Sequence, residues 1–200
     1  MATLIFFCTI IAILCSLISV IIKAVRHRRV APGIRTTLII IGSYFALWVV
    51  FYFLREDKPV PLGTDICFDD WCATITKIER PKSLAYENMI LNPKGQFIIL
   101  QIKMSNHARG IAQKPSEPRI HLIDGSGKIW TYSEDGQKML EKISGKLIPL
   151  DEKLELHESL ETRMVFDIPN DKGDWKALID EGPFITKLLF NEDRKVFLLN

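Results

Sequence analysis

Two long apolar segments open the chain, and a different pattern follows them. Residues 3–22, TLIFFCTIIAILCSLISVII, carry no charge, and residues 36–54 form a second run of the same kind. At about 1.5 Å per residue, helices of this length span a hydrocarbon core of about 30 Å. We therefore expect two transmembrane helices. A pair of buried core helices is the alternative, and uncharged runs this long argue against it.

The first run does not resemble a cleaved signal peptide. It lacks a basic segment before it, its apolar stretch is too long, and no small-x-small cleavage site follows. A lipoprotein-type cysteine is also disfavoured, because bulky Leu14 stands before Cys15 where such motifs have a small residue. We expect a retained membrane anchor.

Residues 23–35 connect the two runs and are strongly basic. Pro32 and Gly33 favour a turn there. The basic side chains are Lys23, Arg26, Arg28, Arg29 and Arg35. Because short basic loops stay in the cytoplasm, this loop places the N-terminus and everything after residue 54 on the extracytoplasmic side. A specific lipid or phosphate site is another use for these charges, although topology alone accounts for them.

Gly42 and Ala46 form a small-xxx-small pair in the second apolar run. Small residues let helix backbones approach closely in lipid. We expect the pair to pack the two helices of the hairpin together. Docking on another membrane protein is a second possible use.

After residue 54 the chain has the pattern of a soluble domain. Residues 55–64, REDKPVPLGT, combine charges with Pro and Gly and are typical of a linker. We expect one extracytoplasmic domain over residues 65–200. Within it, FIILQIKM at 97–104 has a period of two, with Ile98, Leu100, Ile102 and Met104 on one face and Gln101 and Lys103 on the other, which predicts a half-buried strand.

Other short segments share this β character. We expect further strands at 72–78, 119–123, 128–132, 162–168, 185–190 and 195–199. The sequence DGSG at 124–127 predicts a hairpin turn, and residues 133–145 favour a short helix or a long crossover. About seven or eight short strands with turns between them predict a mainly β domain, an antiparallel immunoglobulin-like sandwich.

Three segments carry a resemblance to a known family. They are NPKGQFIILQIKMSN at 92–106, IHLIDGSGKIWTYS at 120–133 and LETRMVFDIP at 160–169. Together they resemble a bacterial family of domains of unknown function found on envelope lipoproteins and membrane-anchored proteins. The resemblance covers roughly residues 62–190. It implies an extracytoplasmic immunoglobulin-like sandwich and brings no catalytic residues.

Cys67 and Cys72, in CFDDWC, are the only cysteines after residue 54. Directly opposed residues of a hairpin have the spacing of a disulfide, and disulfides persist outside the cytoplasm. We expect a disulfide that closes this hairpin. A redox pair prefers Cys-x-x-Cys and an environment that stabilises the thiolate, which Asp69 and Asp70 disfavour. Zinc needs four ligands, and the histidines are scattered singly.

Charge and motifs narrow the function classes further. The net charge of +2 comes from the basic loop, because residues 55–200 carry 21 basic and 24 acidic side chains, or −3. This balance does not suit nucleic acid. The chain lacks Gly-x-Ser-x-Gly, a P-loop and Gly-x-Gly-x-x-Gly, so we expect no enzyme, cofactor or metal site.

These observations predict a multi-pass cell-membrane protein with a sandwich on the extracytoplasmic side. We expect a non-enzymatic interaction or assembly module of the cell envelope, whose partners are the lipid bilayer and another envelope or membrane protein. The alternative is a sensor or carrier that binds a small ligand between the sheets. A large apolar pocket favours the alternative, and a filled core favours protein binding.

Overall fold

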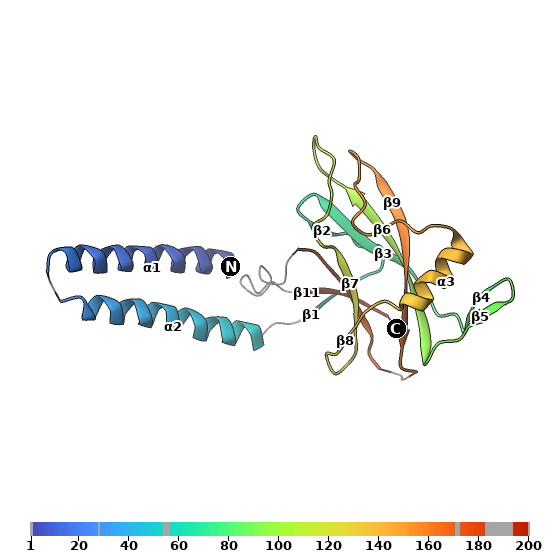
Figure 1. Ribbon diagram of the computed structural model, residues 1–200, viewed down its shortest axis with the longest axis horizontal. Helices are drawn as coiled ribbons and strands as arrows, with labels where there is room; N and C mark the ends of the chain where they lie inside the picture. The colour runs from blue at the N-terminus through green and yellow to red at the C-terminus, as the bar shows by residue number, and fades with distance from the viewer. Residues whose placement is uncertain (1, 28, 54–56, 171–172, 183–193, 200) are drawn as a thin grey trace. The chain divides into compact units, whose positions relative to one another are not determined.

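The computed structural model describes residues 2–27, 29–53, 57–170, 173–182 and 194–199 (Figure 1). The chain divides into two compact units. One contains two N-terminal helices, and the other begins at Asp57 and contains all the described strands. Each unit is described by itself.

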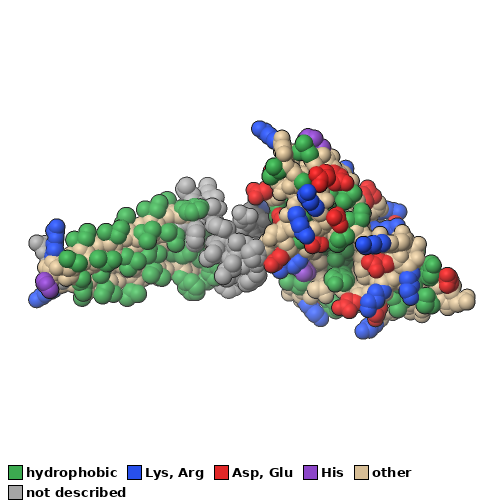
Figure 2. Space-filling view, turned by 45° about the horizontal axis from the view of Figure 1, so that its top comes forward, with side chains coloured by type: hydrophobic (Ala, Val, Ile, Leu, Met, Phe, Trp, Pro, Cys, Tyr) green, Lys and Arg blue, Asp and Glu red, His purple; other side chains and the backbone are tan. Residues whose placement is uncertain are grey.

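The helical unit is a hairpin of α1 (Ala2–Val25) and α2 (Ala31–Phe53). Both helices are long and apolar enough to cross a membrane by length and composition. Figure 2 shows hydrophobic side chains over most of the visible surface of this unit. The predicted loop at 23–35 is shorter than expected, because Pro32 and Gly33 lie inside the first turn of α2. Proline suits that position since no intrahelical bond needs its missing N–H.

The helices approach closely at Gly33 but not at Gly42. A Cβ atom on Gly33 would lie 2.6 Å from Cγ2 of Val20 in α1. One turn later the buried Thr37 hydroxyl lies 2.8 Å from the Ser16 hydroxyl, so a polar contact joins the helices beside the glycine. Gly42 has no atom within 4 Å of its Cβ position, and Ala46 is also exposed. This corrects the expectation that these two residues pack the hairpin.

The second unit is a β-sandwich, as predicted. One sheet has the order β1 (Asp57–Val60), β11 (Arg194–Leu198), β10 (Lys176–Asp180), β7 (Arg119–Ile123), β8 (Ile129–Trp130). The other has the order β2 (Ile66–Phe68), β3 (Trp71–Glu79), β6 (Gln96–Asn106), β9 (Ser159–Ile168). A separate hairpin joins β4 (Leu84–Tyr86) to β5 (Met89–Leu91). The described residues thus form eleven strands, so the expected seven or eight were too few. The strand expected at 185–190 lies outside the described residues.

The sandwich begins eight residues earlier than predicted, because part of the expected linker is a strand. Residues Asp57–Val60 pair in parallel with Arg194–Phe197, so this sheet is not purely antiparallel. The Asp57 carboxylate lies 3.0 Å from Nζ of Lys176 and 2.7 Å from a guanidinium nitrogen of Arg194. Burial raises the pKa of Asp57, but the hydrogen bonds and charges of these two cations outweigh it, and the pKa falls below 3.8.

Part of the four-stranded sheet is buried on both faces, which the pattern of β6 only half predicted. Its inner face contributes Ile98, Leu100, Ile102 and Met104 to the main core between the sheets. On the outer face, Phe97 and Ile99 join Val165 of β9 in a second core. That second core is covered by Leu84 of β4 and by Leu140 of α3 (Glu134–Ser144) (Figure 1).

Helix α3 confirms the helical interpretation of residues 133–145. It begins where the Ser133 hydroxyl accepts a hydrogen bond from the Gly136 N–H, a regular N-cap. Its Gln137 side chain bonds the free edge of β9, donating to the Arg163 carbonyl at 2.8 Å and accepting from the Val165 N–H at 3.1 Å. The helix therefore occupies part of an edge that another strand would otherwise pair with.

Candidate functional site

The disulfide lies at one end of the sandwich. Cys67 of β2 and Cys72 of β3 are directly opposed in the hairpin, and their sulfur atoms are bonded. This confirms the predicted pairing. The hairpin turn between them presents Asp69 and Asp70, and the Asp70 carbonyl accepts a hydrogen bond of 2.8 Å from the N–H of His107. The disulfide therefore holds a turn that contacts the end of β6.

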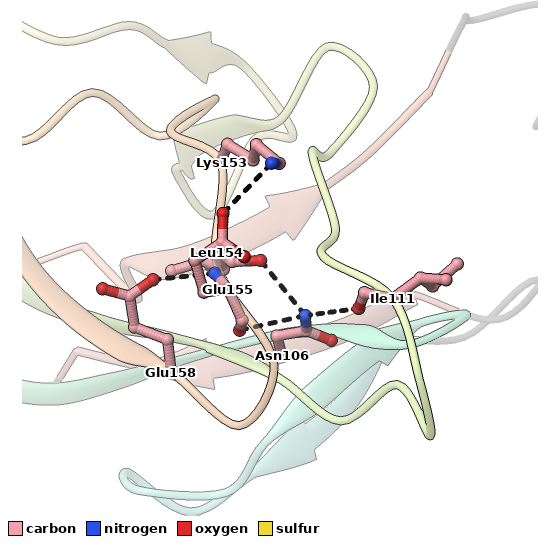
Figure 3. A network of polar contacts seen from close by, with 6 residues as sticks. All are labelled: Asn106, Ile111, Lys153, Leu154, Glu155 and Glu158. Carbon is pink, nitrogen blue, oxygen red and sulfur yellow. Dashed lines mark hydrogen bonds and ion pairs between the residues drawn. The ribbon is translucent and has the colours of Figure 1, made fainter.

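Asn106, the last residue of β6, organises this end of the sandwich (Figure 3). Its side-chain N–H₂ lies 3.0–3.1 Å from the carbonyl oxygens of Ile111, Leu154 and Glu155. Its side-chain oxygen accepts from the Ala108 N–H at 2.8 Å. Because the side chain is 3% exposed, water does not replace these bonds. One buried amide thus connects segments almost 50 residues apart.

Backbone pairing strengthens the same connection. Gln113 and Leu154 exchange two backbone hydrogen bonds of 2.9 and 2.8 Å, an isolated antiparallel bridge. Around it, the Glu155 N–H donates to the Glu158 carboxylate at 2.7 Å, and Lys153 forms an ion pair with Glu155 at 3.0 Å (Figure 3). The loop that contains Gln113 and the loop that contains Leu154 are therefore bonded to each other.

These two loops expose apolar side chains to solvent. Ile111 is 63% exposed and Leu156 is 44% exposed, although each adjoins a backbone group that Asn106 fixes. We call this surface the Asn106 face and define it as residues 68–71, 107–114 and 151–158. It combines exposed apolar side chains with a rigid polar base, an arrangement that suits recognition of another macromolecule.

A second motif residue, Asp124, closes the β7–β8 hairpin. Its carboxylate accepts from the Ser126 hydroxyl and N–H, the Lys128 N–H and the Trp130 indole N–H, at 2.6–3.2 Å. The Ser126 hydroxyl and the Trp130 indole are the main causes that lower the pKa of Asp124 to about 2. The predicted DGSG turn is confirmed, and the role of its aspartate is structural.

Asp167 has a similar role at the opposite end of β6. Its carboxylate accepts hydrogen bonds from the N–H groups of Lys94 and Gly95, at 2.9 and 3.2 Å. A Cβ atom on Gly95 would lie 2.2 Å from the carbonyl oxygen of Ile168, so only glycine fits this approach. The motif positions Asn106, Asp124 and Asp167 therefore each close a loop.

A cleft of about 260 Å³ lies near this opposite end. Arg80, Lys82, Gln96 and Asn170 are among the residues that line it. The Arg80 guanidinium donates to the Leu199 carbonyl oxygen, so part of its hydrogen-bonding capacity is already used. Among the residues that the structure describes, no three His, Cys, Asp or Glu side chains are grouped as a metal site would need.

The predicted site residues fall into separate places. Cys67 and Cys72 lie beside the Asn106 face, while Lys23, Arg26, Arg29 and Arg35 belong to the helical unit. Arg28 lies outside the described residues. Sequence reasoning did not single out Asn106 as a site residue, although Asn106 ends the segment 92–106 that carries the family resemblance.

Comparisons with known proteins show the fold and no more. No family model matches the chain, and no curated protein matches it. A conserved hypothetical protein from Bacillus anthracis is similar in structure, with a TM-score of 0.51 and 15% identity over 71% of this chain and 96% of the other. An uncharacterized beta-sandwich protein from Clostridium difficile 630 matches at a TM-score of 0.46, with 15% identity over 73% and 96%. The secreted protein MPT63 from Mycobacterium tuberculosis matches at 0.43, with 9% identity over 72% and 98%.

Proposed function

We propose that the protein is a membrane-anchored interaction or assembly module of the cell envelope, with an extracytoplasmic immunoglobulin-like sandwich and no reaction of its own. One observation carries the proposal, namely that side chains fill the space between the sheets. Ile75, Leu100 and Phe166 from one sheet and Leu122 and Phe197 from the other are fully buried in one continuous core. A sandwich filled in this way acts through its surface.

The filled core also weighs against the alternative function, a carrier of small ligands. Drug-sized ligands occupy pockets of about 300–1,000 Å³ that enclose most of their surface. The cleft beside Arg80 is smaller and lies outside the main core, since Phe97 in its lining belongs to the second core. The intersheet position predicted for a ligand is taken by the side chains just named.

Two features support the proposed location. The helices of the hairpin have the length and composition of membrane spans, and the residues between them are basic. Basic loops are retained in the cytoplasm, which directs the sandwich to the other side. The Cys67–Cys72 disulfide agrees with an oxidising compartment there.

Cysteine labelling in intact cells tests this topology. In a chain carrying Cys8→Ser and Cys15→Ser, a cysteine at His27 should resist membrane-impermeant maleimide, and one at Lys94 should react. Replacing Arg26, Arg28, Arg29 and Arg35 with Gln should produce mixed orientations, because these charges hold the loop inside. Labelling at His27 but not at Lys94 would reverse the orientation and remove the proposed location.

The interaction role is tested in the same membranes. An impermeant lysine-reactive crosslinker should join the full chain to another envelope or membrane protein. Native mass spectrometry of the detergent-solubilised chain provides the contrast. A chain recovered free of protein adducts but carrying a small molecule in stoichiometric amount would favour the carrier function instead.

A further inference from the structure

From the Asn106 face, we infer the kind of partner that this module binds: a protein with a positively charged surface that receives Ile111 and Leu156 at its centre. This inference rests on the proposed interaction function and assigns it a surface and a partner chemistry. The argument has three steps, which concern charge, apolar exposure and rigidity.

The first step is charge. The Asn106 face contains six acidic side chains and three Lys or Arg side chains, a formal charge of −3. The rest of residues 55–200 has eighteen of each sign and is neutral. The acidic residues are Asp69, Asp70, Asp151, Glu152, Glu155 and Glu158. All the net charge of the sequence after residue 54 thus lies in three short segments at one end of the sandwich.

Ion pairs inside the face do not cancel this charge. Two of its three cations already form ion pairs with acidic residues of the same face. Lys114 pairs with Asp151 at 3.5 Å, and Lys153 pairs with Glu155 at 3.0 Å. Asp69 and Glu152 are both exposed. A cationic partner therefore meets a favourable potential, which raises association rates and disfavours acidic competitors.

The second step is the apolar centre. Ile111 and Leu156 belong to two different loops, and the carbonyl oxygens of Ile111 and Glu155 both lie within 3.1 Å of the same Asn106 nitrogen. The apolar positions are thereby held at one place in the fold. In the sequence, Glu155 and Glu158 stand on either side of Leu156, and Arg109 and Lys114 on either side of Ile111. Protein interfaces have this composition, an apolar centre with a charged rim.

The third step is rigidity. Loops that are ordered before binding lose less conformational freedom on binding. Here the Asn106 amide, the Gln113–Leu154 bridge and the contact between Asp70 and His107 fix all three segments to the sandwich. The disulfide completes the set, because it holds the turn that carries Asp69 and Asp70. The loops of the Asn106 face are therefore ordered before the partner binds.

Site-specific photocrosslinking of the full chain in intact membranes tests the inference. The photoreactive residue p-benzoylphenylalanine replaces Ile111 or Leu156 in two test variants, and Ile90 or Ile129 in two controls. All four side chains are exposed and apolar, but Ile90 and Ile129 lie outside the Asn106 face. We expect adducts with another protein from positions 111 and 156 and little from the controls.

Charge-reversal variants test whether the acidic residues of the Asn106 face contribute to binding of the crosslinked protein. Asp69→Lys with Glu152→Lys should lower the adduct yield from position 111 about tenfold and reduce its salt dependence. Glu87→Lys with Glu141→Lys makes the same charge change at exposed positions outside the face, and should leave the yield unchanged. A comparable loss in both pairs, or in neither, overturns the inference.

The remaining outcomes are also decisive. Adducts of twice the chain mass identify a second copy as the occupant, and lipid adducts identify the bilayer; either result overturns the inference. Protein adducts from Ile90 or Ile129 alone leave the proposed interaction function standing but move it to another surface. The absence of protein adducts at all four positions overturns both.

Discussion

The two ends of strand β6 use different chemistry to hold the loops that leave it. At the Gly95 end, backbone N–H groups need an acceptor, and the Asp167 carboxylate provides it. At the Asn106 end, backbone carbonyls need a donor, and a neutral amide provides it. The difference follows from burial, because a charge is tolerated where water can reach it and is costly where water cannot.

The comparison also separates two kinds of constraint. Asn106 is needed for what its side chain does, since four polar contacts depend on it. Gly95 is needed for what it lacks, since a side chain would meet the backbone of Ile168. Each of the two residues therefore has a structural role at its own end of β6.

The largest effect is expected at Asn106. Asn106→Ala should lower the free energy of unfolding by about 3 kcal/mol, because it leaves buried carbonyl oxygens and the Ala108 N–H without a partner. Asn106→Asp should be at least as damaging, since carboxylate oxygens would face carbonyl oxygens. Chemical denaturation of the detergent-solubilised full chain, followed by tryptophan fluorescence, measures both changes.

An exposed asparagine at the other end provides the control. Asn92→Ala lies outside both cores and should change stability by less than about 0.5 kcal/mol. If Asn106→Ala costs no more than this control, the contacts in Figure 3 do not hold the loops.

Gly95→Ala tests the opposite end and should cost about 2 kcal/mol. The added methyl group would overlap the Ile168 carbonyl oxygen. Relief of this overlap requires a backbone shift where β6 pairs with β9. Gly125→Ala is the matched control, since no atom lies within 4 Å of its Cβ position. Equal stabilities for the two variants would mean that the close approach is absent in solution.

The disulfide should contribute less than either. Replacing both Cys67 and Cys72 with Ala should cost about 2 kcal/mol or less, because the bond closes a very short loop. Single replacements should lower the amount of exported protein more than the double replacement does, since each leaves one thiol to mispair. Thiol labelling without reductant gives the direct measurement, and two reactive thiols in exported protein would contradict the bond.

The same contrast explains how far the sequence predicts the fold. Alternation in β6 placed Ile98, Leu100, Ile102 and Met104 in the main core correctly. Phe97 and Ile99 stand on the face expected to be polar, and their apolar character indicates a second layer on that face. The covering strands β4 and β5 were not predicted, because they are only three residues each and give little periodicity.

Non-local pairing limited the rest. Asp57–Val60 has the charges and proline of a linker, and it becomes a strand only because its partner, Arg194–Phe197, lies over 130 residues away. Asn106 is similar, because two of its three carbonyl partners, those of Leu154 and Glu155, lie 48 and 49 residues away in the sequence. By contrast, the Asp124 turn and the Cys67–Cys72 pairing were predictable, since all their partners lie within six residues.

Asp124 gives the smallest expected effect, and its contribution should change with pH. Its pKa is about 2 in the folded protein, below the ordinary value of 3.8, so the folded state favours the charged carboxylate. The stabilisation is therefore complete above about pH 4 and is lost as the pH falls toward 2.

Asp124→Asn should be less stable than the wild type at pH 7, and the difference should shrink as the pH falls from 4 toward 2. Asp174→Asn, at an exposed position outside this turn, is the control and is measured under the same conditions. Denaturation curves at pH 7, 4 and 2.5 measure the trend, and a difference for Asp124→Asn that stays constant down to pH 2.5 would show that the carboxylate charge does not hold the turn.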